Sequence, residues 1–203
     1  MAYLSPLIVA ACRQRGITAE WFPVRLETEP GQTFDHQWIY QQIDRANAWL
    51  AAQPGADDTK AMLHFHTDSG TMSHTFGIYP ARQMPLSKRL AGCVAGAVRQ
   101  ALGTERLATF DRLGDTDYNT YVFAQQAKFT VALIELCSHQ SERDMAALFG
   151  RPGDLAAAIA EGLAEYWALP APASAGEDRL RTSAAQAIAL MEQAMALLRG
   201  ANA

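Results

Sequence analysis

Three of the five histidines of this 203-residue chain lie close together, in the stretch LHFHTDSGTMSH at 63–74. Because alternate side chains of a strand share one face, His64 and His66 are expected to point the same way, about 7 Å apart along the chain. Imidazole nitrogens are common zinc ligands, so the pair suggests a metal site that His74 extends. Two polar residues at the solvated rim of a sheet are the simpler alternative.

The second candidate is Glu135, a carboxylate within the apolar run FTVALIEL at 129–136. An ionised carboxylate is costly to bury unless it meets a cation, a metal-bound water or several hydrogen-bond donors. If the strand ends near Leu136, Glu135 instead faces solvent at the carboxyl edge of the sheet, where ligand sites of open α/β sheets also lie. Together with His66, this carboxylate suggests metal-assisted hydrolysis, in which it takes a proton from a metal-bound water.

Helical and strand periodicities alternate along the chain, which predicts an α/β domain with a mostly parallel sheet flanked by helices. Glycines at 16 and 103 are expected to end two of the helices. Ser141 and Asp154 are expected to cap the start of two others. The predicted helices cover 4–15, 35–52, 85–102, 141–149 and 154–169, and the predicted strands cover 20–26, 60–66, 75–80, 118–123 and 129–136.

The composition changes after Trp167, where the segment LPAPASAGED at 169–178 has the character of a linker. This boundary divides the chain into a domain at 1–168 and a C-terminal amphipathic helix at 179–199. The helix is expected to pack back onto the domain, and self-association through it is the alternative. Its apolar stripe consists of Leu180, Ala184, Ile188, Met191, Met195 and Leu198.

Composition and charge exclude several classes of protein. The chain is 49% hydrophobic with a net charge of -4, which is typical of a globular domain. Its 17 basic residues are scattered among 21 acidic ones, so no nucleic-acid partner is expected. No apolar run approaches the ~20 residues of a membrane span. Three widely spaced cysteines without a CxxC pair argue against a disulfide framework and a cysteine zinc cluster.

The order of motifs resembles that of the zinc-dependent N-acetylmuramoyl-L-alanine amidases, cell-wall amidases with an α/β fold that include endolysins and autolysins. The resemblance covers residues 1 to about 168. Ala46-Asn47 matches the family's A-N helix, LHFHTDS takes the place of the S-I-H-A-N strand, and Gly77, Ile78 and Tyr79 loosely match a G-x-x-x-Y-Y strand. TVALIELCSHQSERD is similar to P-A-V-L-V-E-L-G-F-x-S-N-x-x-D, and LAAAIAEGLAEYW to A-E-A-I-A-x-G-I-x-x-Y.

The resemblance implies a zinc enzyme that cleaves the amide between N-acetylmuramic acid and L-alanine in peptidoglycan. By position, His66 corresponds to a zinc ligand and Glu135 to the catalytic carboxylate. His64 becomes a rim or substrate-facing residue, and Tyr79 and Tyr121 are weaker candidates for substrate contact. The compartment is left open: the cell wall, periplasm or extracellular space is expected if the true N-terminus carries a signal, and a phage lysis system otherwise. A non-catalytic, amidase-like protein that binds cell walls or another partner is the alternative.

The sequence departs from the family at its start. The family's first strand, D-P-G-H-G-G, supplies a zinc histidine and is followed by a glutamate ligand, and both would fall before Met1. We therefore expect a sheet without the family's first strand. Three explanations are possible, in this order: a truncated sequence, a catalytically silent relative of the family, or replacement of the missing zinc ligands by His36, His64 or His74.

Overall fold

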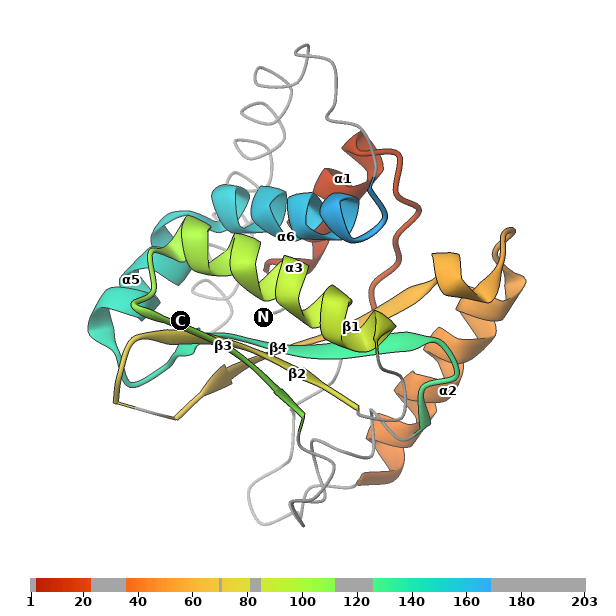
Figure 1. The fold of residues 1–203 in the computed structure, drawn as a ribbon, viewed down its shortest axis with the longest axis horizontal. Coiled ribbons are helices and arrows are strands. Elements are labelled where there is room, and N and C mark those ends of the chain that lie inside the picture. The colour runs from red at the N-terminus through yellow and green to blue at the C-terminus, as the bar shows by residue number, and fades with distance from the viewer. Residues whose placement is uncertain (1–2, 23–35, 70, 81–84, 112–125, 169–203) are drawn as a thin grey trace, which may run out of the picture.

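The computed structural model is a four-stranded sheet with helices on both faces (Figure 1). The residues that it describes are 3–22, 36–69, 71–80, 85–111 and 126–168. The strands are β1 (Ala61–Asp68), β2 (His74–Tyr79), β3 (Arg106–Asp111) and β4 (Thr130–Ser138). The helices are α1 (Ser5–Gln14), α2 (His36–Ala52), α3 (Leu86–Leu102), α5 (Glu142–Gly150) and α6 (Pro152–Tyr166), with a short 3-10 helix at Asp57–Thr59.

The strands lie in the order β1-β4-β2-β3, and two of the three pairings are parallel. β1 runs parallel to β4 and β2 parallel to β3, whereas β2 and β4 are antiparallel. The prediction of a mostly parallel α/β sheet is therefore confirmed. Within the described ranges no strand pairs with the other edge of β1.

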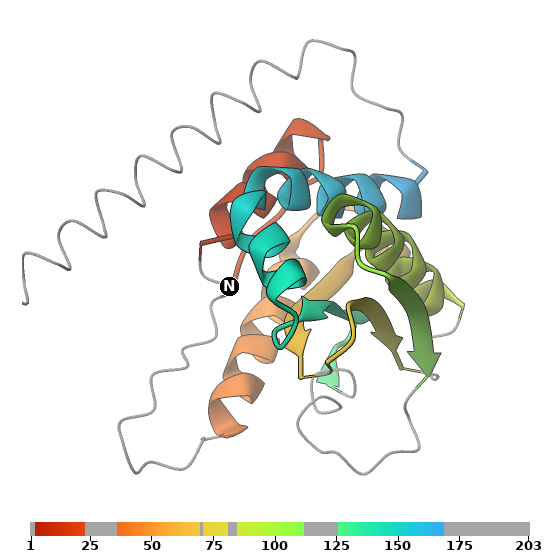
Figure 2. The same ribbon diagram turned by 90° about the vertical axis from the view of Figure 1, so that its left-hand side faces the viewer.

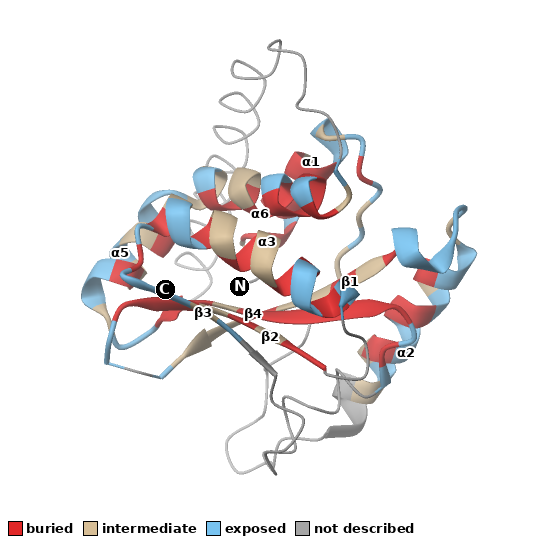
Figure 3. Ribbon diagram, in the orientation of Figure 1, coloured by how far each residue is buried: buried red, intermediate tan, exposed pale blue. Residues whose placement is uncertain are grey.

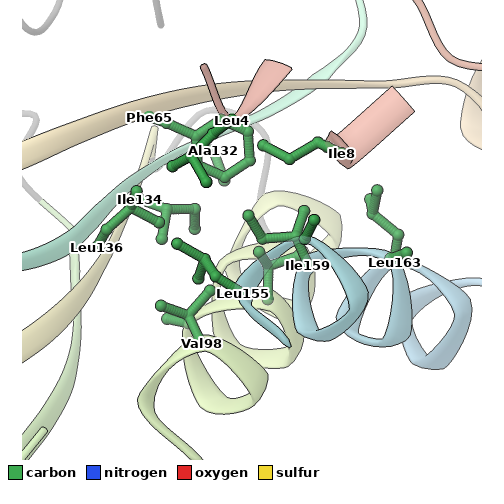
Figure 4. Packing of buried hydrophobic residues seen from close by; sticks show 14 of the residues in the cluster. Leu4, Ile8, Phe65, Val98, Ala132, Ile134, Leu136, Leu155, Ile159 and Leu163 are labelled. Atoms are coloured by element: carbon green, nitrogen blue, oxygen red, sulfur yellow. The ribbon is translucent and has the colours of Figure 1, made fainter. Parts of the chain in front are cut away.

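The main hydrophobic core lies between the sheet and the helices α1, α3 and α6, which share one face of the sheet in both views (Figures 1 and 2). Phe65 of β1 and Ala132, Ile134 and Leu136 of β4 point into it, against Leu155 of α6 and its neighbours (Figure 4). β4 is buried along almost its whole length (Figure 3). This explains why its sequence is continuously apolar rather than alternating.

A smaller core on the opposite face is formed by α2. Ile43 and Leu50 of this helix pack in one cluster with Met62 of β1 and Val131 of β4. Because side chains alternate along a strand, the residues two and four positions after Met62 and Val131 share the α2 face. The pleat therefore places His64, His66 and Glu135 on the side of the sheet opposite the main core.

Most of the predicted elements are confirmed, with ends shifted by a few residues. The Ser141 cap is confirmed, since its Oγ accepts a hydrogen bond from the Asp144 N–H at 3.2 Å. The Asp154 cap is wrong: α6 begins at Pro152, whose fixed φ suits the first turn of a helix.

Strand β3 was not predicted, and the predicted strand at 20–26 is not seen at 20–22. The rest of that strand, the strand at 118–123, the linker at 169–178 and the helix at 179–199 lie outside the described residues. In the part of the chain that the structure describes, no helix is long and apolar enough to cross a membrane.

Helices α3 and α6 approach closely at Gly162. A Cβ on Gly162 would lie 2.7 Å from the Val94 Cα and 2.8 Å from the Cys93 carbonyl oxygen. Gly162→Ala is therefore expected to lower the free energy of unfolding by about 1–3 kcal/mol, because two backbones must separate. Chemical denaturation measures this loss. Gly96→Ala in α3 is the control, since its Cβ meets nothing within 4 Å, and it should leave stability equal or higher. Equal effects of the two variants would contradict the packing argument.

Candidate functional site

The pairing of β1 with β4 brings His66 and Glu135 side by side. They are direct partners in the parallel register, so both side chains leave the sheet on the α2 face. The His66 Nδ1 lies 4.0 Å from the Glu135 Oε1. The His66 side chain is 42% exposed and that of Glu135 only 13%. The register shifts directly after this pair, between His66 and Asp68, and such irregularities often re-aim side chains beside functional sites.

His64 lies beside the His66 ring, at the edge away from Glu135. The two Nε2 atoms are 3.2 Å apart, whereas the ring centroids are 4.3 Å apart. Since the nitrogens are closer than the ring centres, the Nε2 edges of the two imidazoles face each other. The His66 ring therefore has His64 at its Nε2 edge and Glu135 at its Nδ1 edge.

Burial favours the neutral form of both imidazoles. It lowers the pKa of His64 from 6.5 to about 3, and the neighbouring His66 adds to this effect. Burial also lowers the pKa of His66. At neutral pH the two rings are therefore uncharged, which is the form that can bind a metal.

The lowered pKa of His64 predicts a loss of stability in acid. The unfolded chain binds a proton on this residue below pH 6.5, whereas the folded chain does so only near pH 3. This contribution to stability is therefore full above pH 6.5 and is lost as the pH falls toward 3, by up to about 1.4 kcal/mol per pH unit. Urea denaturation at about pH 7.5 and about pH 5 should show a smaller acid loss for His64→Gln than for the wild type. Equal losses would contradict the burial of a neutral imidazole.

His74 is not brought into this cluster. Its Nδ1 donates a hydrogen bond to the Met72 carbonyl at 2.6 Å, and its Nε2 lies 2.9 Å from the Asp68 Oδ2. Its ring stacks on Phe76, with centroids 4.0 Å apart. These contacts hold β2 to the end of β1. Phe76 pairs with Glu135 across β2 and β4, so an aromatic ring flanks the carboxylate on the side away from His66.

The other expected site residues lie elsewhere. Tyr79 is buried in the main core, on the opposite face of the sheet from Glu135, and this position does not favour substrate contact. Tyr121 and the side chain of His36 lie outside the described residues. Asn47 of the A-N motif is buried and bridges α2 to the segment before β4. Its Oδ1 accepts from the Lys128 N–H at 2.9 Å and its Nδ2 donates to the Gln126 carbonyl at 3.1 Å.

Sequence reasoning missed Asp144, a buried carboxylate behind the carboxyl end of β4. The side chain is 1% exposed and accepts hydrogen bonds from the Ser73 hydroxyl at 2.6 Å and the Ser138 N–H at 3.2 Å. These hydrogen bonds connect the start of α5 to the end of β4 and to the residue before β2. An aspartate three residues after the helix-capping Ser141 was the available signal.

The donor chemistry of the site suits zinc only in part. Two neutral imidazoles with a carboxylate nearby are appropriate groups, since zinc binds histidine nitrogen and carboxylate oxygen. Among the described residues, however, no group of three or more His, Cys, Asp or Glu side chains is arranged to hold a metal ion. A catalytic zinc ordinarily has three protein ligands, so the described residues by themselves do not complete such a site.

The comparisons with known proteins agree with this fold. No family model and no curated protein matches the sequence. The catalytic domain of the CD27L endolysin targeting Clostridia difficile matches with a TM-score of 0.58 and 16% identity, over 80% of this chain and 79% of that one. The CwlD amidase of Clostridioides difficile, solved with the GerS lipoprotein, matches at 0.60 and 14%, over 83% and 84%.

The N-acetylmuramyl-L-alanine amidase Ami1 of Mycobacterium smegmatis has a TM-score of 0.60 and 18% identity, over 82% of this chain and 74% of that one. The chain has the N-acetylmuramoyl-L-alanine amidase fold. The amidase fold expected from the order of motifs is thus confirmed over about four fifths of the chain. At identities of 14–18% the likeness concerns the fold alone.

Proposed function

We propose that the protein is a peptidoglycan hydrolase that cleaves the amide bond between N-acetylmuramic acid and L-alanine. In this proposal His66 holds a zinc ion and Glu135 is the proton acceptor. The observation that carries it is the 4.0 Å approach of the His66 Nδ1 to the Glu135 Oε1 on one face of an amidase-like sheet.

A bound zinc would supply Lewis-acid chemistry, polarising the lactyl carbonyl and lowering the pKa of water toward neutrality. His66 would hold the ion through a neutral imidazole nitrogen. Glu135 would take the proton of the attacking water and pass it to the departing L-alanine nitrogen. The carboxylate suits this role because it is largely shielded from solvent and has Phe76 and the His66 ring as its neighbours across the sheet.

Zinc-dependent release of stem peptides from purified peptidoglycan tests this proposal. The wild type should release soluble peptides with a free L-alanine amine, and a chelator should stop the release until zinc is restored. His66→Ala should lose the activity together with the bound zinc. Lys88→Ala, at an exposed position of α3, is the surface control and should retain both. Zinc-independent release, or full activity in His66→Ala, would contradict the proposal.

The second candidate is a non-catalytic, amidase-like protein that binds cell walls. The lack of a three-ligand group among the described residues favours it. Co-sedimentation with purified peptidoglycan in the presence of a chelator would support this candidate if no peptide is released on adding zinc. The absence of both binding and cleavage would contradict both candidates.

A further inference from the structure

An apolar groove lies beside the edge of β1 that pairs with no strand in the described ranges. It encloses about 460 Å³, and its walls come from α1, α2, α6, β1 and the segment at 16–21. Leu63 and Phe65 of β1 line it. These two side chains lie on the main-core face of the sheet, opposite His64 and His66, so the groove is separate from the candidate site.

The groove gathers tryptophan side chains. Three of the chain's four tryptophans, Trp21, Trp49 and Trp167, line it, and all three are only partly buried in the described structure. The Trp167 Nε1 is buried and has no hydrogen-bond partner among the described residues, which is unusual for an indole donor. A concave apolar surface with large, partly exposed aromatic rings is typical of a binding site.

We propose that this groove is the docking site of the chain's own C-terminal amphipathic helix, expected at 179–199, and that Ile188, Met191 and Met195 enter it. Positions i, i+3 and i+7 lie on one face of a helix, which is the pattern by which amphipathic helices anchor in apolar grooves. The apolar stripe of this helix needs such a surface, because it would otherwise face solvent. The docking does not depend on the proposed amide cleavage.

The chain can reach the groove because the described structure ends at its wall. Trp167 lines the groove and directly follows the end of α6 at Tyr166. The connection at 168–178 has about 11 residues, which span up to roughly 36–40 Å when extended. A helix over 179–199 would be about 30 Å long, at 1.5 Å per residue. The connection can therefore place either end of the helix at Trp167, so that the helix can lie in the groove in either direction.

The side-chain chemistry of the two surfaces matches. Methionine sulfur makes favourable contacts with aromatic rings, and its flexible side chain fills irregular gaps, so Met191 and Met195 suit a groove lined by indoles. Other large hydrophobic residues are exposed on separate segments and do not line the groove. Among the described residues these are Met72, Leu86, Leu107 and Phe149. Apolar residues exposed singly in this way are normal on a protein surface and do not require a partner.

Methyl NMR of the full chain with 13C-labelled methionine tests the docking. Nuclear Overhauser effects are expected from the Met191 and Met195 methyl groups to the indole protons of the three groove tryptophans. Met72 is the internal control, since it is 55% exposed and lies outside the groove, and its methyl group should show no contact with those rings. Contacts of the two methionines with Tyr3 and Phe149 instead, or no aromatic contact of either, would overturn the proposal.

A matched pair of full-length variants places the same charge on opposite faces of the expected helix. Acrylamide quenching of tryptophan fluorescence should rise about 2-fold in Met191→Glu, because the helix no longer shields the indoles, and should stay unchanged in Gln193→Glu. Sedimentation of the wild type should show a monomer of 22.1 kDa. Equal quenching in the two variants would overturn the docking. A wild-type dimer that Met191→Glu dissociates would overturn it in favour of self-association through the stripe.

Discussion

Glu135→Gln is expected to lower the rate of amide cleavage by about 10²–10⁴-fold, the usual contribution of a positioned general base. Glutamine has nearly the same shape but cannot take the proton of the attacking water. The zinc affinity of the variant should remain close to that of the wild type, because Glu135 is proposed to act on the water rather than on the metal. The rate of appearance of free L-alanine amines from purified peptidoglycan, measured with zinc present, provides the test.

The matched control for this variant is Glu105→Gln. Glu105 is 64% exposed and pairs with Arg143 on the surface, at 3.0 Å between Oε1 and Nη1. Surface ion pairs contribute little, so this variant should keep the wild-type rate within about 2-fold. A Glu135→Gln protein that cleaves as fast as Glu105→Gln would remove Glu135 from the mechanism.

Asp144→Ala is expected to have the largest effect on stability, lowering the free energy of unfolding by about 3 kcal/mol. The substitution leaves the Ser73 hydroxyl and the Ser138 N–H without their acceptor at buried positions. Each buried donor that loses its partner costs about 1–3 kcal/mol. Urea denaturation at neutral pH, monitored by circular dichroism, gives the loss directly.

Asp154→Ala is the control for Asp144→Ala. Asp154 lies exposed in the first turn of α6, where a negative charge interacts favourably with the helix dipole. A loss of about 0.3–1 kcal/mol is expected there. Similar losses for the two variants would show that the hydrogen bonds of Asp144 do not stabilise the junction of β4 and α5.

The pairing of His66 with Glu135 could be anticipated because both lie in strands with clear sequence signals. The apolar run of β4 and the turn-bounded stretch of β1 are local patterns, and an acid within the first of them stands out. Resemblance then supplied the order of the elements, and the parallel register places the two side chains next to each other.

Neither strand β3 nor the order of the strands could be predicted from local sequence patterns. Among the described strands β3 lies at the edge of the sheet, and its residues Arg106 and Leu107 are exposed, so it lacks the apolar alternation that identifies a half-buried strand. β1 and β2 are joined by a short loop, yet β4 lies between them. That arrangement depends on contacts between residues far apart in the sequence.

The contact between the His64 and His66 rings depends on side-chain orientation. The His-x-His spacing fixes a shared face but not which ring nitrogens meet. Ring rotation is set by the surrounding packing, and here it brings the Nε2 edges together. The position of Tyr79 has the same kind of cause, because its face of β2 is covered by the main core.

The most direct test of the proposed reaction is to cleave purified muropeptides in 18O-labelled water and to determine by mass spectrometry which product carries the 18O atom. Attack of water on the lactyl carbonyl predicts one 18O atom in the carboxylate left on the N-acetylmuramic acid product, and none in the released peptide, whose new end is the L-alanine amine. Label at a peptide carboxylate or at a sugar carbon would show that another bond is cut and would contradict the account.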